Sequence, residues 1–221
     1  MNTKYNIGII GGTGDAGCGL AVRLAKAGHV VTIGSREEQK AKQVENNIIA
    51  NYNGLKTRGA TNQEAATCPI VIVATPWDAT IATLRPLKDE LKDKTVVSMV
   101  NSVIMENKEM HSVIPSSGSM AFEIANLLKS DTVTGAFHHL PAKQLLKLET
   151  QLDQDVVIFG DSDQAVEQTL ELTNSIKNLK GVYVGSIKLS FAVEAFTSVL
   201  VSASIRHKGH ASIKLTGIKP K

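Results

Sequence analysis

The chain has 221 residues, of which 43% are hydrophobic and 20% charged, enough for one substantial core in an ordinary globular composition. Its formal net charge of +3 is too small to indicate nucleic acid as a partner, and the positive residues are spread along the chain apart from a locally basic segment over 206–221. No apolar stretch reaches the ~20 residues needed to cross a bilayer and no signal peptide precedes the first strand, so we expect no membrane association.

The first predicted strand, over residues 5–10, leads into a glycine-rich turn, Gly12-Thr13-Gly14-Asp15-Ala16-Gly17. A helix is predicted next, from Cys18 to Ala27. Glycines between a strand and a helix are typical of dinucleotide sites, because they allow a tight turn and a close approach of the backbone to a pyrophosphate. The free N–H groups of the helix favour an anion there. We expect a dinucleotide site; the alternative is a turn that only packs.

The second predicted strand, Val30 to Ile33, indicates which dinucleotide binds. An NAD site normally places an acid at this strand end, whereas this chain offers Ser35, Arg36 and, one turn on, Lys40. A guanidinium can hold a 2′-phosphate through paired hydrogen bonds. The pattern favours NADP over NAD. Alternatively, Ser35 only caps the next helix and the two cations are solvated surface charges.

Strands and helices alternate along the rest of the chain, which predicts a Rossmann-type, doubly wound, mainly parallel α/β sheet. The further expected elements are a helix over 36–51, a strand over 56–60, a short helix capped by Asn62, a strand over 70–74, a helix over 78–92 with Pro86 inside it, a strand over 95–99, a long loop, a helix over 119–128, strands over 132–137, 156–159 and 182–184, a helix capped by Asp161 or Ser162, and a C-terminal helix over 187–206. We expect an NADP-binding domain over 1–185 and a helical segment over 186–221 that closes the substrate pocket.

Ligands of such sheets bind beyond the carboxyl ends of the strands. That rule selects the loops at 11–17, 34–36, 75–77 and 98–103, and also 138–141 if the strand before it is parallel. Trp77 stands at one strand end, where it either lines the cofactor groove or begins the core face of a helix.

His138 and His139 follow a strand, so their side chains should point to opposite faces and at most one should reach the pocket. One packed and one exposed histidine is the competing interpretation; His138 is the weak candidate for a catalytic role. The histidines lack ligand spacing and the two cysteines, Cys18 and Cys68, lack it too. We therefore expect no metal, and a reducing, cytoplasmic environment.

Together these motifs resemble the NADPH-dependent F420 reductases, the F420H2:NADP oxidoreductases. The resemblance runs through nearly the whole chain. The motifs that carry it are the glycine turn, Gly34-Ser35-Arg36, Thr75-Pro76-Trp77, His138-His139-Leu140-Pro141, Ser117-x-Ser119-x-Ala121-x-Glu123-Ile124, Asp153-x-Asp155-Val156, Gly160-Asp161 and Val193-Glu194-x-x-Thr197.

This resemblance implies hydride transfer between NADP(H) and the deazaflavin coenzyme F420, with the protein stacking the two rings and excluding water. It places Thr13, Gly14, Asp15 and Ala16 at the pyrophosphate and Ser35, Arg36 and Lys40 at the 2′-phosphate. It places Trp77, Ile81, Val103 and Ala142 along the rest of NADP, and Asn101, His138, Leu140 and Thr197 at the deazaflavin. No side chain need act as an acid or base.

Two other functions remain open. One is NADPH-dependent reduction of another small acceptor, such as an imine, a flavin or a ferric complex, because the fold alone does not fix the chemistry. The other is a non-enzymatic NADP(H) sensor without a substrate pocket. The C-terminal helix carries more apolar side chains than one packed face requires, which predicts a homodimer.

Overall fold

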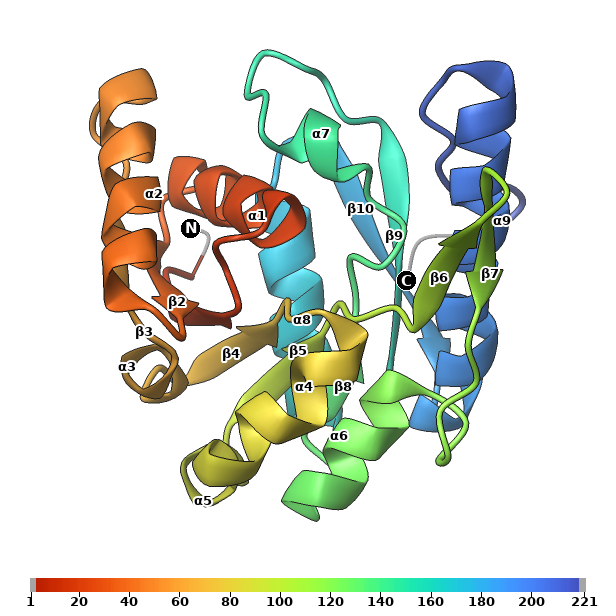
Figure 1. Ribbon diagram of the computed structural model, residues 1–221, viewed down its shortest axis with the longest axis horizontal. Helices are drawn as coiled ribbons and strands as arrows, with labels where there is room; N and C mark the ends of the chain where they lie inside the picture. Colours follow the sequence, from red (N-terminus) through yellow and green to blue (C-terminus); the bar gives the residue numbers. More distant parts are fainter. Residues whose placement is uncertain (1–2, 219–221) are drawn as a thin grey trace.

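The computed structural model describes residues 3–218 and has one large sheet covered by helices on both faces (Figure 1). The strand order is β10-β9-β8-β5-β4-β1-β2-β3. The strands are β1 (Asn6–Ile10), β2 (Val30–Ser35), β3 (Thr57–Thr61), β4 (Ile70–Val73), β5 (Thr95–Ser98), β8 (Val133–Gly135), β9 (Gln154–Gly160) and β10 (Leu179–Gly185). All neighbours are parallel except β8 and β9, which confirms the predicted, mainly parallel sheet.

The α-helices alternate with these strands. They are α1 (Asp15–Lys26), α2 (Glu38–Asn51), α3 (Asn62–Ala66), α4 (Trp77–Leu84), α5 (Lys88–Leu91), α6 (Met120–Leu128), α7 (Ala142–Leu145), α8 (Asp163–Ser175) and α9 (Ser190–His207). Because side chains alternate along a strand, the sheet supports two cores: Ile9 packs with Leu20 of α1, whereas Ile10 packs with Leu84 of α4 and Ile124 of α6. Figure 1 shows α4, α5 and α6 together below the sheet.

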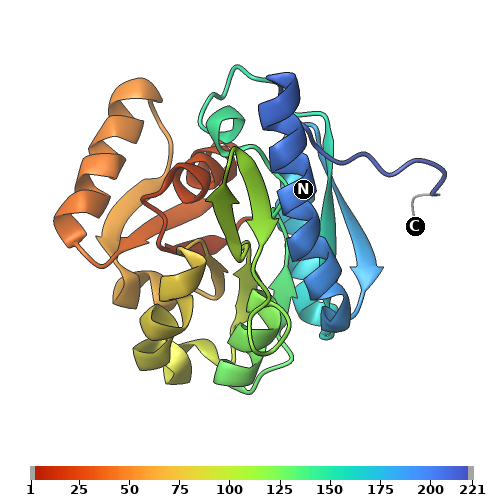
Figure 2. The same ribbon diagram turned by 45° about the vertical axis from the view of Figure 1, so that its right-hand side comes forward.

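The long loop expected after β5 contains a second, two-stranded sheet instead. Strands β6 (Val103–Glu106) and β7 (Glu109–Ser112) form an antiparallel hairpin whose turn residues, Asn107 and Lys108, both have positive φ. The hairpin stands beside α9 in both ribbon views (Figures 1 and 2). Its attachment is polar: Ser112 Oγ donates to the Ala195 carbonyl, and Met110 N–H donates to Ser202 Oγ.

Three helix boundaries differ from expectation. Helix α1 begins at Asp15, one turn before Cys18, so the last residues of the glycine motif are helical. The helix expected over 78–92 is divided into α4, a 3₁₀ turn (Arg85–Leu87) and α5, because Pro86 lacks the N–H that a continuous helix needs. Thr61, and not Asn62, caps α3; at α8 the cap is Ser162, which confirms one of the two predicted caps.

Within residues 3–218, one helix is long and apolar enough to span a membrane by length and composition, contrary to the sequence expectation. It runs over Ile187–His207, including a 3₁₀ turn at Ile187–Leu189, and its apolar window has a mean hydropathy of 1.4. A single helix of this kind is weak evidence for a membrane span, and 22% of its apolar window is buried in the protein. The buried residues of α9 are Ser190, Glu194 and Thr197, whereas Leu189, Phe191, Phe196 and Val199 are exposed, although Phe196 also stacks edge-on against His139.

Candidate active site

The glycine turn after β1 has a backbone that other residues would disturb. Gly11 has a φ of +73°, and a Cβ on Gly17 would lie 2.8 Å from Gly12 Cα, so the turn and the packing of α1 both need glycine. A Cβ on Gly14 would meet nothing within 4 Å, which leaves open space above the turn. Gly14 is also the N-cap of α1 and supplies no side-chain cap, so the first N–H groups of the helix face that space. This geometry fits a pyrophosphate.

A hollow of about 410 Å³ lies over this turn, and we call it the first hollow. Its lining brings together all the residues that the resemblance assigned to the phosphates of NADP; of the predicted cofactor residues in the glycine turn, Gly12 does not line it. The residues in the lining are Gly11, Thr13, Gly14, Asp15, Ala16, Gly17, Ser35, Arg36, Glu37, Lys40, Asn62, Ala74, Thr75, Pro76, Ala79 and Thr83.

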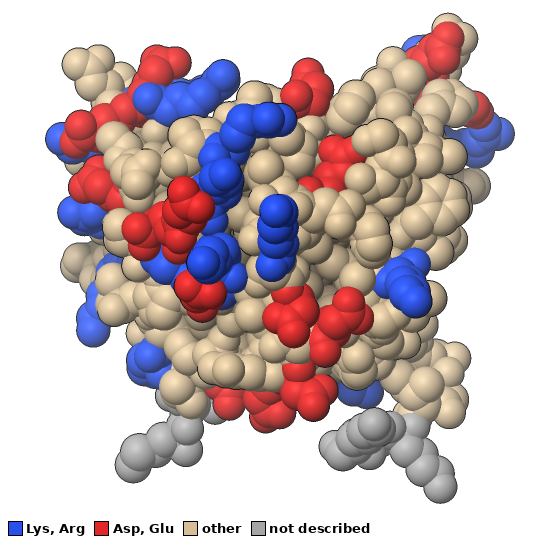
Figure 3. All heavy atoms as spheres, turned by 90° about the horizontal axis from the view of Figure 1, so that it is seen from below, with Lys and Arg blue, Asp and Glu red and all other residues tan. Residues whose placement is uncertain are grey.

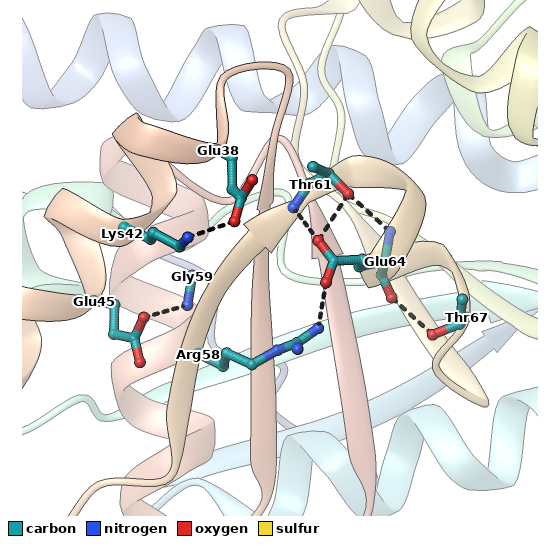
Figure 4. A network of polar contacts seen from close by, with 8 residues as sticks. All are labelled: Glu38, Lys42, Glu45, Arg58, Gly59, Thr61, Glu64 and Thr67. Carbon is teal, nitrogen blue, oxygen red and sulfur yellow. Dashed lines mark hydrogen bonds and ion pairs between the residues drawn. The ribbon is translucent and has the colours of Figure 1, made fainter.

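The end of the first hollow beyond β2 is positively charged. Arg36 and Lys40 are exposed, and within residues 3–218 neither forms an ion pair. Of the two acids that follow Arg36, Glu38 is paired with Lys42 at 2.6 Å (Figure 4), whereas Glu37 lines the hollow without an ion pair within residues 3–218 and offsets one of the two cations. Ser35 Oγ accepts the Glu37 N–H at 3.2 Å and keeps its own proton free to donate. These groups fit a 2′-phosphate.

Sequence reasoning missed Asn62 as a site residue, because it was interpreted as a helix cap. Thr61 takes that position: its hydroxyl accepts the Glu64 N–H, and the Glu64 carboxylate accepts the Thr61 N–H and pairs with Arg58 (Figure 4). The Asn62 side chain is thereby free, and its Oδ1 accepts the Gly11 N–H at 3.1 Å. Asn62 thus ties α3 to the glycine turn.

A further hollow of about 410 Å³ adjoins Arg36 between α3 and α4. Its walls include Gln63, Ala79, Thr83, Pro86 and Leu87. The 3₁₀ turn at Pro86 therefore forms part of the wall of this hollow, through Pro86 and Leu87.

A hollow of about 650 Å³, which we call the second hollow, lies between the sheet, the hairpin and α9. It brings together Asn101, His138, Leu140 and Thr197, which the resemblance assigned to the deazaflavin, with Val103 and Ala142, which it assigned to NADP. Asp15 and Ala16 line both hollows, so the two meet at the start of α1. Its other walls, which the sequence did not identify, include Met99, Met105, Met110, Phe137, Leu200, Val201, Ser204, Ile205 and the segment 209–211.

The two adjacent histidines both reach the second hollow, contrary to the expectation of at most one. Phe137 has a φ of +65°, which breaks the strand geometry on which the alternation argument depended. His139 is partly buried and not exposed, and its Nε2 donates to the Val193 carbonyl at 2.7 Å. His138 is 5% exposed, stacks on Phe159, and has no hydrogen-bond partner for either ring nitrogen within residues 3–218.

Burial, with a small contribution from His139, lowers the pKa of His138 to about 3. Its ring is therefore neutral near pH 7, with one nitrogen a donor and the other an acceptor. An unpartnered buried imidazole is costly in free energy, so this ring is suited to a polar group of a ligand.

Asn101 and Thr197 form a polar link beside His138. The Thr197 hydroxyl donates to Asn101 Oδ1 at 2.9 Å, and Asn101 Nδ2 donates to the His138 carbonyl at 3.0 Å. This link fixes three walls of the second hollow to one another: the loop after β5, the loop after β8, and α9.

Two predicted cofactor residues stand apart from both hollows. Trp77 and Ile81 lie on α4, half-buried against the second core. The indole N–H of Trp77 donates to the Val103 carbonyl at 3.1 Å, so Trp77 holds the first residue of the hairpin in place. Within residues 3–218 no cluster of His, Cys, Asp or Glu could hold a metal ion.

Comparison with known proteins finds relatives by sequence and, separately, solved structures of similar fold. Residues 6–102 match a family described as NADP oxidoreductase, coenzyme F420-dependent. The chain is 32% identical to the F420-dependent NADP reductase of Methanocaldococcus jannaschii over 96% of its length and 99% of the relative's. It is 30% identical to the reductase of that name from Methanothermobacter thermautotrophicus, over 96% and 95%. A crystal structure of a candidate F420-dependent NADP reductase from Arthrobacter sp. FB24 superposes with a TM-score of 0.82 at 19% identity, over 96% of this chain and 99% of that one.

Proposed function

The chain belongs to the F420-dependent NADP reductases, and from that premise we propose that it transfers a hydride between NADP(H) and coenzyme F420. The observation that carries the proposal is the pair of hollows that meet at Asp15 and Ala16. One has the open N–H groups and cations that a dinucleotide phosphate needs, and the other is roomy and mostly apolar. A nicotinamide ring and a deazaflavin ring bound in these hollows come together at the start of α1.

At the NADP end, the backbone of Thr13, Gly14, Asp15 and Ala16 binds the pyrophosphate, and the α1 dipole adds to the attraction. Ser35, Arg36 and Lys40 bind the 2′-phosphate, and the hollow between α3 and α4 takes the adenine. Val103 and Ala142 lie along the nicotinamide half. Trp77 and Ile81 remain assigned to NADP, but they act on it indirectly. Trp77 holds the first residue of the hairpin, and Ile81 supports α4.

At the other end, Asn101, His138, Leu140 and Thr197 bind the deazaflavin. When both ligands are bound, the nicotinamide and deazaflavin rings supply the hydride chemistry themselves. The protein holds the rings in contact, and the methionines and aliphatic side chains of the second hollow exclude water. His138 supplies a neutral hydrogen bond to the deazaflavin, and no side chain transfers a proton.

The hollow walled by α9 favours a reductase over a sensor, because a sensor needs no second cavity. It also favours a flat polycyclic acceptor over a small imine, which would leave most of about 650 Å³ unfilled. We place the enzyme in the cytoplasm, since both cysteines are free.

We also propose a homodimer through α9. Leu189, Phe191, Phe196 and Val199 are 41–54% exposed on this helix, and isolated monomers rarely expose a contiguous apolar surface of this kind. Figure 3 shows few charged side chains on the right-hand side, where α9 lies in Figure 1. Sedimentation velocity should give twice the monomer mass, and Phe191→Glu should return it to one; flotation with lipid vesicles would contradict the proposal.

Steady-state turnover tests the function. Purified protein mixed with NADPH and oxidised F420 should bleach the deazaflavin absorbance, and NADP with reduced F420 should restore it. FMN and a cyclic imine serve as alternative acceptors. Turnover with one of these and none with F420 would replace the proposed substrate, and tight NADPH binding without any turnover would favour the sensor.

A further inference from the structure

Glu194 is a carboxylate buried in the protein away from both hollows. It lies on α9 and is 3% exposed. Its two oxygens accept the N–H groups of Met120, at 2.8 Å, and Ala121, at 2.9 Å, which are the first two residues of α6. A buried carboxylate is tolerated only with such partners, and the N-terminus of a helix is a favourable place for it.

A second contact joins the same two helices one turn earlier. Ser119 caps α6 by accepting the Phe122 N–H, and its hydroxyl lies 2.6 Å from the hydroxyl of Ser190, the first residue of α9. The first two turns of α9 are therefore fixed to the start of α6 by side chains that have no access to either ligand.

The next turn of α9 is part of the substrate site. Thr197 lies three residues after Glu194, so the two side chains share one side of the helix. Thr197 donates to Asn101, and Leu200 and Val201 continue the wall of the second hollow. The position of this part of the wall therefore depends on the position of the preceding turn of α9, which carries Glu194.

We infer that Glu194 is a positioning residue for the second substrate: by holding α9 on the N-terminus of α6, it sets the distance of Thr197 and Leu200 from the deazaflavin. The inference rests on the proposed function. It concerns the deazaflavin end of the second hollow, because the hollows assigned to the phosphates and adenine of NADP are formed by elements that Glu194 does not contact. The F420 and NADPH ends should therefore respond differently.

Glu194→Gln separates positioning from simple stability. The amide keeps the shape of the carboxylate, but only its oxygen can accept, and its NH₂ opposes one of the two α6 N–H groups. At pH 8 we expect the KM for F420 to rise roughly tenfold or more, since small misplacements of binding groups cost one to two orders of magnitude. The KM for NADPH should stay within about twofold, and kcat at saturating F420 should largely recover.

Ser162→Ala is the matched control. It removes the side-chain cap of α8, which accepts the Ala165 N–H, and leaves α9 and both hollows untouched. A control variant with a lower melting temperature and an unchanged KM for F420 shows that lost stability alone does not produce the effect. Equal changes of both KM values in Glu194→Gln, or none, would overturn the inference.

Hydrogen exchange gives a readout independent of turnover. In Glu194→Gln the amides of α9 from residue 197 to 201 should exchange faster than in the wild type, while those of α1 should not change. If the wild type fails to turn over F420, the proposed function is refuted, and exchange still decides on the position of α9. Unchanged exchange in α9 would overturn it.

Discussion

Arg36→Ala is the sharpest test of the NADP end of the site. The Arg36 side chain is exposed and forms no ion pair within residues 3–218, so its removal breaks no contact that stabilises the fold. The variant should therefore unfold at the same urea concentration as the wild type. Any change in cofactor affinity then reports on the ligand and not on the stability of the first hollow.

The magnitude follows from the kind of interaction lost. A hydrogen bond between charged partners contributes about 1.5–3 kcal/mol, and the 2′-phosphate is absent from NADH. We expect the Kd for NADPH to rise roughly 10- to 150-fold and the Kd for NADH to change by less than about twofold. Adding Lys40→Ala should weaken NADPH binding further, by a smaller factor, because an ammonium lacks the paired geometry of a guanidinium.

Fluorescence titration with each nucleotide measures both constants. Lys56→Ala is the control, because it removes an exposed cation that forms no ion pair within residues 3–218 and lines none of the three hollows. That variant should keep its preference for NADPH. If Arg36→Ala still prefers NADPH as strongly as the wild type, or if NADH binding falls in parallel, Arg36 does not contact the 2′-phosphate.

Three further predictions concern other parts of the site. Asn62→Asp keeps an acceptor for the Gly11 N–H but adds a negative charge to the first hollow, so it should weaken NADPH binding more than Asn62→Ala does; equal losses in titration would contradict this. Thr197→Val leaves Asn101 Oδ1 without its donor and should raise the KM for F420 roughly 5- to 100-fold with the KM for NADPH unchanged, as kinetics with each substrate varied will show. Burial raises the pKa of Glu194 to about 7, so between about pH 4.5 and 7 the folded protein holds a proton that the unfolded chain has lost. As the pH rises through this range, the free energy of unfolding should fall by up to about 3 kcal/mol. Urea titrations of Glu194→Gln should lack that decrease.

The sequence predicted the parts of this site that depend on short-range patterns. The glycine turn and the cations after β2 each directly follow a strong apolar run in the sequence, and so do the other loops at the carboxyl ends of strands. The parallel sheet brings these loops together at one edge. The second hollow was predicted through the family resemblance, since nothing in the periodicity connects Asn101 with Thr197.

Other features were missed for physical reasons. The hairpin has strands of only four residues, which are mostly exposed, and its turn at Asn107 and Lys108 has no glycine, so neither alternation nor a turn motif marked it. Asn62 was interpreted as a cap because asparagine is a good one, but the competing Thr61 has a glutamate three residues on and forms the reciprocal cap. The alternation argument for the histidines failed at the left-handed Phe137.

Asp15 and Ala16 belong to both hollows, so an occupant of one forms part of the wall that the other occupant meets. The binding of two ligands that share a wall is thermodynamically linked. If the first ligand changes the dissociation constant of the second by some factor, the second changes that of the first by the same factor. A substitution at Ala16 that enlarges the side chain should thus alter the cooperativity with which the two coenzymes bind. The affinity for either coenzyme then has to be stated together with the occupancy of the other.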